Sequence, residues 1–327
     1  MSVVQTIRGP IESGELGWTL SHEHLTAGAA GMERLPWVFD EAEAASLNIE
    51  ALGRVRQAGI QSMIDLTPLD LGRNMGLFRR VAEADTGVHV VCATGVYRWV
   101  PAYLMGREPD DVADHLLREL RDGIEGTGIR PGIIKLAWDL EYRLHDGPAG
   151  FTPRANLERT ARGAARAAKV AGVPISCHTL AADELGTPLL DIFEDEGLDL
   201  RAVTIGHSND SQDPEYLLRL VRRGANVGLD RFGVLRGEEE MARRAQLALG
   251  LIRAGFAEQV CLSHDGSPYM RFGAPRPPNL DCWLPVPTWE VPWLLEHGAS
   301  QDDVDAVMVR SIRRTFEAAA AMAAPAK

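Results

Sequence analysis

The sequence predicts a single domain folded as a (β/α)8 barrel, and three observations lead to this prediction. Short apolar runs rich in β-branched residues alternate with longer segments of helical periodicity. Eight such runs follow the N-terminal lead-in, and this alternation is typical of parallel sheets covered by helices. The chain has 327 residues, 45% of them hydrophobic and 24% charged, which one barrel can hold. A doubly wound open sheet is the weaker alternative.

The predicted strands and helices follow one another regularly along the chain. The strands are expected at residues 19–23, 61–66, 89–95, 132–136, 173–177, 202–205, 226–229 and 259–262. Segments with helical spacing of apolar residues lie at 41–58, 110–125, 153–171, 214–223 and 238–254. Four of these segments are followed directly by a glycine, at positions 59, 172, 224 and 255, where a helix commonly ends.

The domain is expected to span residues 1–327, because no linker rich in Pro, Gly or Ser divides the chain. The alanine-rich tail at 318–327 is expected to fray. Residues 266–287, after the last strand, form a long loop with six prolines. Long loops in compact domains usually serve a function, so this loop and the segment 34–39 are expected to form walls of a substrate pocket.

The charge composition of the chain disfavours some classes of binding partner. The 34 basic and 46 acidic side chains give a formal net charge of -12, which disfavours nucleic acid and anionic membranes. The N-terminus lacks a signal segment, and no stretch approaches the ~20 apolar residues that span a bilayer. We therefore expect a cytoplasmic protein that acts on a small molecule. The cysteines are expected to be buried free thiols, at Cys92, Cys177, Cys261 and Cys282.

Two histidines on the first predicted strand give the first indication of chemistry. Side chains on a strand alternate between its faces, so His22 and His24 point the same way and can meet one metal ion. Glu23, between them, should point to the opposite face and serve a structural role. The pair alone is a weak signal, because two histidines near a strand end are more often exposed or hydrogen-bonded than bound to a metal.

Further polar residues stand at the ends of later strands, namely Lys135, His178, His207 and Asp265. A (β/α)8 barrel builds its active site at the C-terminal ends of its strands, so these side chains are expected to meet His22 and His24. The four histidines and the aspartate suit zinc or a similar divalent ion. The lysine is either a carbamate, formed with carbon dioxide and able to bridge two ions, or one partner of a buried salt bridge.

Taken together, motifs along almost the whole chain resemble those of the phosphotriesterase-like members of the amidohydrolase superfamily. The motifs are GPI at 9–11, LGWTLSHEH at 16–24, DLTP at 65–68, LGRN at 71–74, ATGVY at 93–97, GIIK at 132–135, His178, GHSND at 206–210, LDRFG at 229–233 and LSHD at 262–265. The resemblance implies a (β/α)8 hydrolase with two divalent metal ions. A homodimer is also a family expectation.

The resemblance implies a role for each ligand. The more buried ion would be held by His22, His24 and Asp265, the more exposed ion by His178 and His207, and N6-carboxylated Lys135 would bridge the two. Zinc is the default metal, although such ligands also accept cobalt, manganese or iron. A hydroxide shared by the two ions would be the nucleophile.

Two aspartates are expected to handle the proton of that hydroxide. Asp265 would accept it as the intermediate forms. Asp210 matches the family's acid that passes the proton outward, and its alternative interpretation is an N-cap of the helix that begins near Pro214.

Tyr97 and Arg231 resemble residues of the lactonase branch of the family, which face the metals. The phenol could orient hydroxide or substrate, and the guanidinium offers donors to a carbonyl or a negative substituent. Arg231 could instead form a salt bridge with Asp230 or another acid at the barrel mouth.

The leading hypothesis is therefore a metal-dependent lactonase with side activity on phosphotriesters. One alternative is the cleavage of an amide or carbamate, such as an N-acyl amino acid, with Arg231 holding the substrate carboxylate. A second alternative is a barrel that binds a small molecule without catalysis, which the complete ligand set disfavours.

The remaining conspicuous residues carry less weight. His264 should face away from the metals, and Asp65 and Arg73 fit an internal ion pair as well as any catalytic role. The other histidines lack a constellation of partners and are expected on the surface or on helices, at His89, His115, His145 and His297.

Overall fold

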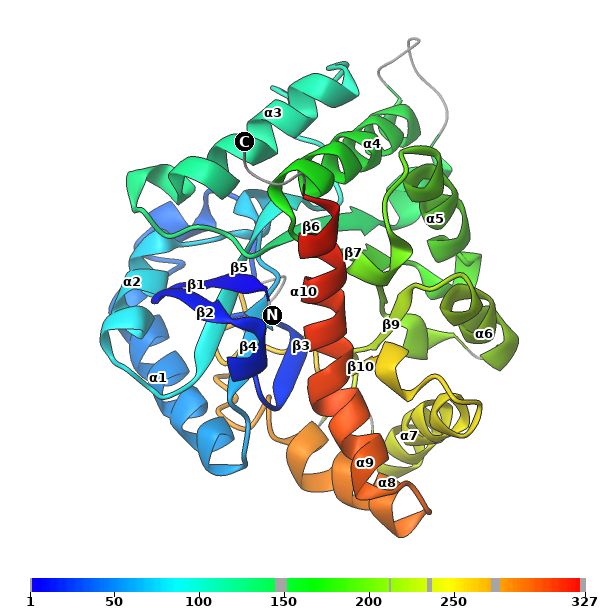
Figure 1. Cartoon of the computed structure of the whole chain (residues 1–327). Coiled ribbons are helices and arrows are strands. Elements are labelled where there is room, and N and C mark those ends of the chain that lie inside the picture. Colours follow the sequence, from blue (N-terminus) through cyan, green and yellow to red (C-terminus); the bar gives the residue numbers. More distant parts are fainter. Residues whose placement is uncertain (1, 145–151, 212, 234–236, 272–276, 324–327) are drawn as a thin grey trace.

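Eight parallel strands form one sheet in the order of the chain (Figure 1). The computed structural model describes residues 2–144, 152–211, 213–233, 237–271 and 277–323. The strands are β3 (Thr19–Glu23), β4 (Ser62–Asp65), β5 (His89–Val96), β6 (Ile133–Trp138), β7 (Ile175–Thr179), β8 (Val203–Gly206), β9 (Asn226–Leu229) and β10 (Val260–Leu262). Each predicted strand is confirmed to within two residues at either end.

The last strand returns to the first and closes the sheet into a barrel. The Ser21 hydroxyl donates to the Leu262 carbonyl at 3.2 Å, and the His22 backbone N–H donates to the Ser263 hydroxyl at 2.9 Å. The Asp265 N–H then donates to the His22 carbonyl at 3.0 Å. The predicted (β/α)8 barrel is confirmed, and the open sheet was the wrong alternative.

Helices surround the barrel, and the five predicted ones are confirmed to within three residues at their ends. The helices are α1 (Glu41–Gln57), α2 (Met75–Glu83), α3 (Pro109–Asp122), α4 (Pro153–Ala171), α5 (Gly186–Asp195), α6 (Pro214–Arg222), α7 (Gly237–Arg253), α8 (Val291–Glu296), α9 (Gln301–Asp305) and α10 (Ser311–Met322). The short helices α2 and α5 were not predicted.

Local sequence explains where these helices start and stop. The Asp40 carboxylate accepts two N–H groups of the first turn of α1, and the Asn74 side chain accepts the Leu77 N–H of α2. Helix α4 ends at Gly172, whose φ of 67° lies in the left-handed region that glycine adopts without strain.

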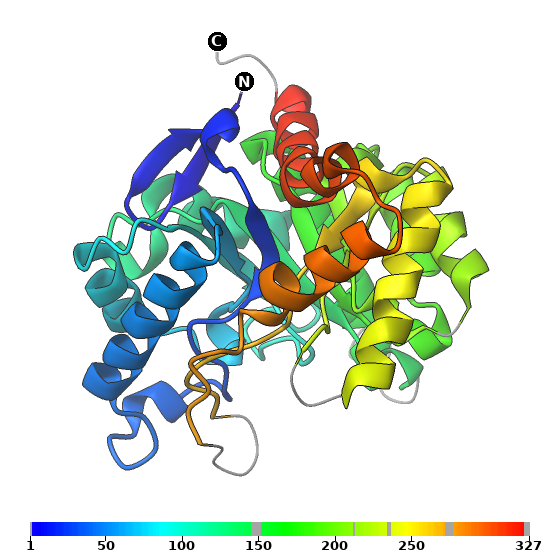
Figure 2. The ribbon, with the colours of Figure 1, turned by 90° about the horizontal axis from the view of Figure 1, so that it is seen from below.

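One end of the barrel is covered. The hairpin of β1 (Val3–Thr6) and β2 (Gly9–Glu12) and the helix α10 lie across it (Figure 1). Val4 and Phe316 belong there to a buried apolar cluster with barrel residues such as Ile64, Val91 and Ile133. Seen from the side, the long loop after β10 lies at the opposite end (Figure 2). The opposite end, where the strands have their C-termini, is therefore the one that can hold an active site.

The predicted fraying of the tail is wrong for residues 318 to 322. Helix α10 continues to Met322, and Ala318 and Ala319 are buried in a small cluster with Ala202. Small alanine side chains allow the helix to approach the start of β8 closely, which the composition alone did not reveal. Residues 324–327 of the predicted tail lie outside the described residues.

One further expectation, on the cysteines, is met by the fold. The four cysteines are buried and free, as predicted. Within the described residues, no helix combines the length and the apolar character needed to cross a membrane.

Candidate metal centre

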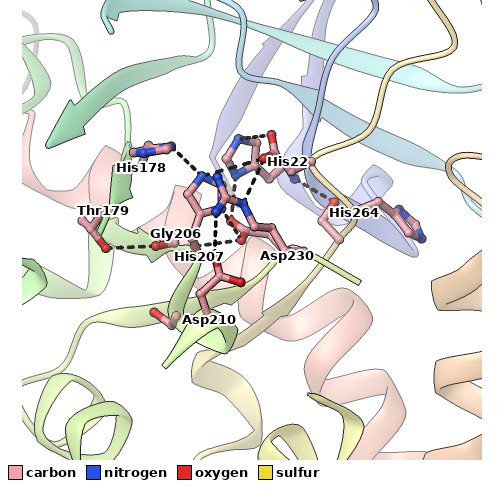
Figure 3. Close-up of polar contacts among 12 residues, drawn as sticks. His22, His178, Thr179, Gly206, His207, Asp210, Asp230 and His264 are labelled. Atoms are coloured by element: carbon pink, nitrogen blue, oxygen red, sulfur yellow. Dashed lines mark hydrogen bonds and ion pairs between the residues drawn. The ribbon is translucent and has the colours of Figure 1, made fainter. Parts of the chain in front are cut away.

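The six predicted ligands come together at the C-terminal end of the barrel. His207 Nε2 lies 2.7 Å from His178 Nδ1, and Lys135 Nζ lies 3.0 Å from His22 Nε2. His24 Nε2 lies 3.0 Å from Asp265 Oδ1. The imidazoles of His22, His178 and His207 converge from different strands (Figure 3). All of these side chains are buried except that of Asp265, which is 24% exposed.

The residue between the two strand histidines points the other way, as predicted. Glu23 accepts hydrogen bonds from the Ser263 hydroxyl at 2.6 Å and the Gly266 N–H at 3.0 Å. It also accepts from His264 Nδ1 at 2.6 Å, so His264 faces away from the ligand cluster (Figure 3). This carboxylate ties the segment after β10 to β3 and helps to place Asp265.

Asp230 fixes the proton positions on two ligand histidines. Its Oδ2 lies 2.7 Å from His22 Nδ1, and its Oδ1 lies 2.9 Å from His207 Nδ1. Burial raises the pKa of this carboxyl, but the opposing effects of His207 and His22 together are larger. The pKa therefore lies well below its ordinary value. An ionised carboxylate only accepts hydrogen bonds, so both imidazoles carry their proton on Nδ1 and direct the Nε2 lone pair into the centre.

The other two histidines are oriented in the same manner. His24 Nδ1 lies 2.8 Å from the Thr67 hydroxyl oxygen, whose own proton is donated to the Thr26 carbonyl. His178 Nε2 lies 2.7 Å from Asp139 Oδ2, so that its Nδ1 lone pair faces the centre.

The centre therefore consists of acceptors that face one another. His207 Nε2 and His178 Nδ1 both face the centre with a lone pair, and so do His24 Nε2 and the Asp265 oxygen beside it. No hydrogen bond can join either pair, since each imidazole directs its one N–H to an outer partner. Divalent cations bind neutral imidazole and carboxylate oxygen, so the donor set fits metal ions. His22, His24 and Asp265 present ligand atoms within 4.8 Å of one another.

Burial tunes the protonation of the ligands. Burial is the largest effect that lowers the pKa of His22 and of His178, each to about 3, so both stay neutral near neutral pH. Burial also lowers the pKa of Lys135 to about 8, which leaves part of its amine neutral. Asp265 and Asp230 lie near enough to raise the pKa of this amine, although no ion pair within 4.0 Å joins either of them to Lys135 in the described residues.

Two of the candidate ligands adopt a backbone conformation that residues other than glycine rarely use. His207 has φ of 59° and Asp265 has φ of 55°. The His207 N–H donates to Asp230 Oδ1 at 2.7 Å, and the Asp265 N–H donates to the carbonyl of His22 at 3.0 Å. Such strain is maintained where surrounding contacts fix it, and it gathers at functional sites.

Arg231 connects two acids at the barrel mouth. Its Nε lies 3.3 Å from Asp265 Oδ2, and one terminal nitrogen lies 2.5 Å from Asp210 Oδ2. The predicted salt bridge with another acid is thus present, although its partner is not Asp230. Asp213 caps α6, so the interpretation of Asp210 as the N-cap was wrong.

Tyr97 stands beside His178. Its hydroxyl lies 3.3 Å from His178 Nδ1, and its backbone N–H donates to Asp70 Oδ2 at 2.7 Å. Burial raises the pKa of the phenol, so the hydroxyl keeps its proton and remains a donor.

Three residues that orient the histidines were missed in the sequence, namely Asp139, Thr67 and Asp230. Asp230 had been considered only as a partner of Arg231. The available signal was its position directly after the end of β9, which is the position that His24 and His207 hold after β3 and β8.

Other expectations are corrected or placed. Arg73 pairs with Glu119 at 2.6 Å, whereas Asp65 accepts the backbone N–H groups of Leu25 and Thr67, so the predicted ion pair between Asp65 and Arg73 is wrong. The remaining histidines lie away from the centre on β5, α3 and the end of α8, at His89, His115 and His297. His145 lies outside the described residues.

Comparison with known proteins agrees with this site. Residues 2–316 match the model of the phosphotriesterase family. A phosphotriesterase homology protein of Mycobacterium tuberculosis is 35% identical over 97% of this chain and 98% of its own length. An aryldialkylphosphatase of Saccharolobus solfataricus is 29% identical over 94% and 96%, and an N-acetyltaurine hydrolase of Danio rerio is 25% identical over 95% and 97%. The chain therefore belongs to the phosphotriesterase family, which confirms the predicted class of metal-dependent hydrolase.

Proposed function

We propose that the chain is a binuclear metal-dependent lactonase with a weaker activity on phosphotriesters. The observation that carries the proposal is the arrangement of the centre, in which four imidazole lone pairs and the Asp265 carboxylate face one another beside the hydroxyl of Tyr97. Such a set of acceptors is suited to cations, and the adjacent donor is suited to a substrate oxygen.

The residues divide into two sets of ligands. His22, His24 and Asp265 would hold one ion, and His178 and His207 the other. Two bound cations supply Lewis-acid polarisation of the ester and lower the pKa of a water molecule. Zinc is the metal that we propose for both positions.

Lys135 would complete the centre as an N6-carboxylated side chain between the two sets. Its Nζ lies 3.0 Å from His22 Nε2 in a buried setting, and the pKa of the amine is lowered to about 8 by burial. Carbon dioxide would add to the neutral amine with release of one proton from the nitrogen to solvent, and the resulting carbamate would place a negative charge among the cations. An unmodified ammonium in the same place would instead be repelled by bound cations.

The chain's other polar residues would position the substrate and move the proton. Asp265 is close enough to the other ligands to accept a proton from an attacking water, and Arg231 and Asp210 extend from it toward the outside. If His178 Nδ1 served as a metal ligand, the Tyr97 hydroxyl beside it would be free to donate a hydrogen bond to a substrate oxygen.

The lactone is favoured over an N-acyl amino acid by the state of Arg231. Two carboxylates, Asp265 and Asp210, already occupy this guanidinium. An arginine engaged in this way has little positive charge left for a substrate carboxylate, which the amide hypothesis requires. The amide alternative keeps one supporting observation, the similarity to the N-acetyltaurine hydrolase of Danio rerio.

Kinetics on three substrate classes test the proposal. Protein purified without chelator is loaded with zinc, and γ- and δ-lactones, paraoxon-like triesters and N-acyl amino acids are compared by kcat/KM. We expect the highest value for a lactone. A triester or an N-acyl amino acid turned over faster than every lactone would overturn the substrate assignment and leave the metal centre in place.

A further inference from the structure

A row of alternating charges continues beyond the residues already described. Arg231 and Arg244 each bind a different oxygen of Asp210, at 2.5 Å and 2.7 Å. The Nε of Arg244 donates to Glu240 Oε1 at 2.8 Å, four residues earlier on α7. From the candidate ligand Asp265 outward, five charged groups thus alternate in sign, with an arginine at the second and fourth places.

Arg244 is buried, with only 2% of its surface exposed, and it lies beside an unusual acid. Glu290, at the end of the π-helix η10 (Val286–Glu290), is 1% exposed. Neither of its carboxyl oxygens has a hydrogen-bond partner within the described residues. The same holds for the Nη1 atom of Arg244. Burial raises the pKa of Glu290 well above its ordinary value, and Arg244 is the nearby charge that opposes this.

These observations distinguish Arg244 from a surface arginine. A buried guanidinium loses its hydration, so its position is fixed by the partners that it keeps. Glu290 makes no hydrogen bond to Arg244, so among the described residues Asp210 and Glu240 are the carboxylates that bind this guanidinium. Buried polar atoms without protein partners, such as Arg244 Nη1, commonly bind internal water.

We propose that Arg244 is a positioning residue for the hydrolytic centre. By holding Asp210 Oδ1 it keeps Asp210 Oδ2 turned toward Arg231, and Arg231 in turn holds the Asp265 carboxylate toward the other ligands. The inference depends on the proposed metal-dependent hydrolysis, but it does not depend on the lactone as substrate. It assigns a function to α7, which contributes no ligand to the centre.

The neighbouring residue on α7 offers a matched control. Arg243 also pairs with Glu240, at 2.8 Å, but its other contacts are the backbone carbonyls of Asn209 and Ser211. The variants Arg244→Met and Arg243→Met therefore each remove an arginine that pairs with Glu240. They differ in whether Asp210 loses a guanidinium.

The test measures kcat/KM on the best substrate of the three classes and the Kd for cobalt of the metal-free protein. Residues that orient metal ligands typically contribute 10–100-fold to either quantity, so we expect Arg244→Met to lower kcat/KM and to weaken cobalt binding, each by roughly tenfold. Arg243→Met should change each by less than about threefold. Arg244→Lys should recover part of the loss, since an ammonium can still bind one oxygen of Asp210.

A double-mutant cycle shows whether Arg244 acts through Arg231. If it does, Arg244→Met added to Arg231→Met should cause little further loss, because the connection is already broken. Independent, additive losses, or cobalt affinity of Arg244→Met equal to that of the parent protein, would overturn the inference. Should no substrate be turned over, the proposed function fails, whereas cobalt affinity still decides the role of Arg244.

Discussion

Replacing Asp230 by asparagine should remove one histidine from the metal centre without changing the shape of the site. Asp230 Oδ1 accepts both the Nδ1–H and the backbone N–H of His207, whereas Oδ2 accepts only the Nδ1–H of His22. An amide keeps its oxygen where two donors point, so its NH2 group takes the place of Oδ2 and faces His22.

The expected consequence is a change of tautomer at His22. A donor opposite Nδ1 stabilises the form with the proton on Nε2, and this proton then points into the centre in place of a lone pair. Loss of such an orienting partner lowers metal affinity by about 10–100-fold, which corresponds to about 1.4–2.8 kcal/mol. The effect should fall on the ion held by His22, His24 and Asp265.

The assay is a cobalt titration of the metal-free protein against a competing chelator, together with urea unfolding. Glu119→Gln serves as the control, because it changes a partly buried carboxylate that pairs with Arg73 and contacts none of the candidate ligands. We expect Glu119→Gln to lower the free energy of unfolding but to change cobalt affinity by less than about threefold. If Asp230→Asn also leaves cobalt affinity within twofold of the parent, the assignment of the His22 tautomer is refuted.

Four further outcomes are expected. Lys135→Ala should lose most binuclear occupancy by metal analysis, with activity partly restored by added bicarbonate or small carboxylates; two tightly bound ions and full turnover would exclude a bridging role. Asp265→Asn should lower kcat by roughly a hundredfold or more, and an unchanged kcat in the fully metallated variant would remove it from proton transfer. Arg231→Ala should weaken the lactone reaction by about 1–3 kcal/mol in kcat/KM, against no change if the side chain does not serve the reaction. The metal-free protein should lose stability as pH falls below 6.5 toward 3, because His22 and His178 stay neutral when folded but gain protons when unfolded; urea unfolding should show a slope of up to about 1.4 kcal/mol per pH unit for each, and a flat profile contradicts it.

The barrel could be predicted because its signal repeats. Each β/α unit shows an apolar run followed by helical spacing, and an error in one unit does not change the topology. Helices α2 and α5 were missed, and the tail of α10 was expected to fray although its alanines pack against the barrel.

The ligands were accessible to sequence reasoning, but the residues that orient them were not. His22, His24 and the later strand-end residues share a position relative to the strands, so the topology brings them together. Asp139 carries no pattern that distinguishes it from other acids, and Asp230 offered only its position directly after β9. Their role depends on which imidazole nitrogen each one meets, and this is set by side-chain rotamers that only the folded structure fixes.

The pairings of the buried charges were also beyond the sequence. Arg73 binds Glu119 on α3, and Arg244 binds Asp210 across the gap between α7 and the end of β8. Both contacts join residues far apart in the chain. Any of the 46 acidic side chains is formally available to each arginine until packing decides.

The most direct test of the centre is anomalous diffraction from crystals of zinc-loaded protein, combined with density around Lys135. We predict two anomalous peaks, one among His22, His24 and Asp265 and one beside His178 and His207, with density for a carboxylate beyond Lys135 Nζ. No peak at the strand ends, or a single peak beside an unmodified lysine, would contradict a binuclear metal centre.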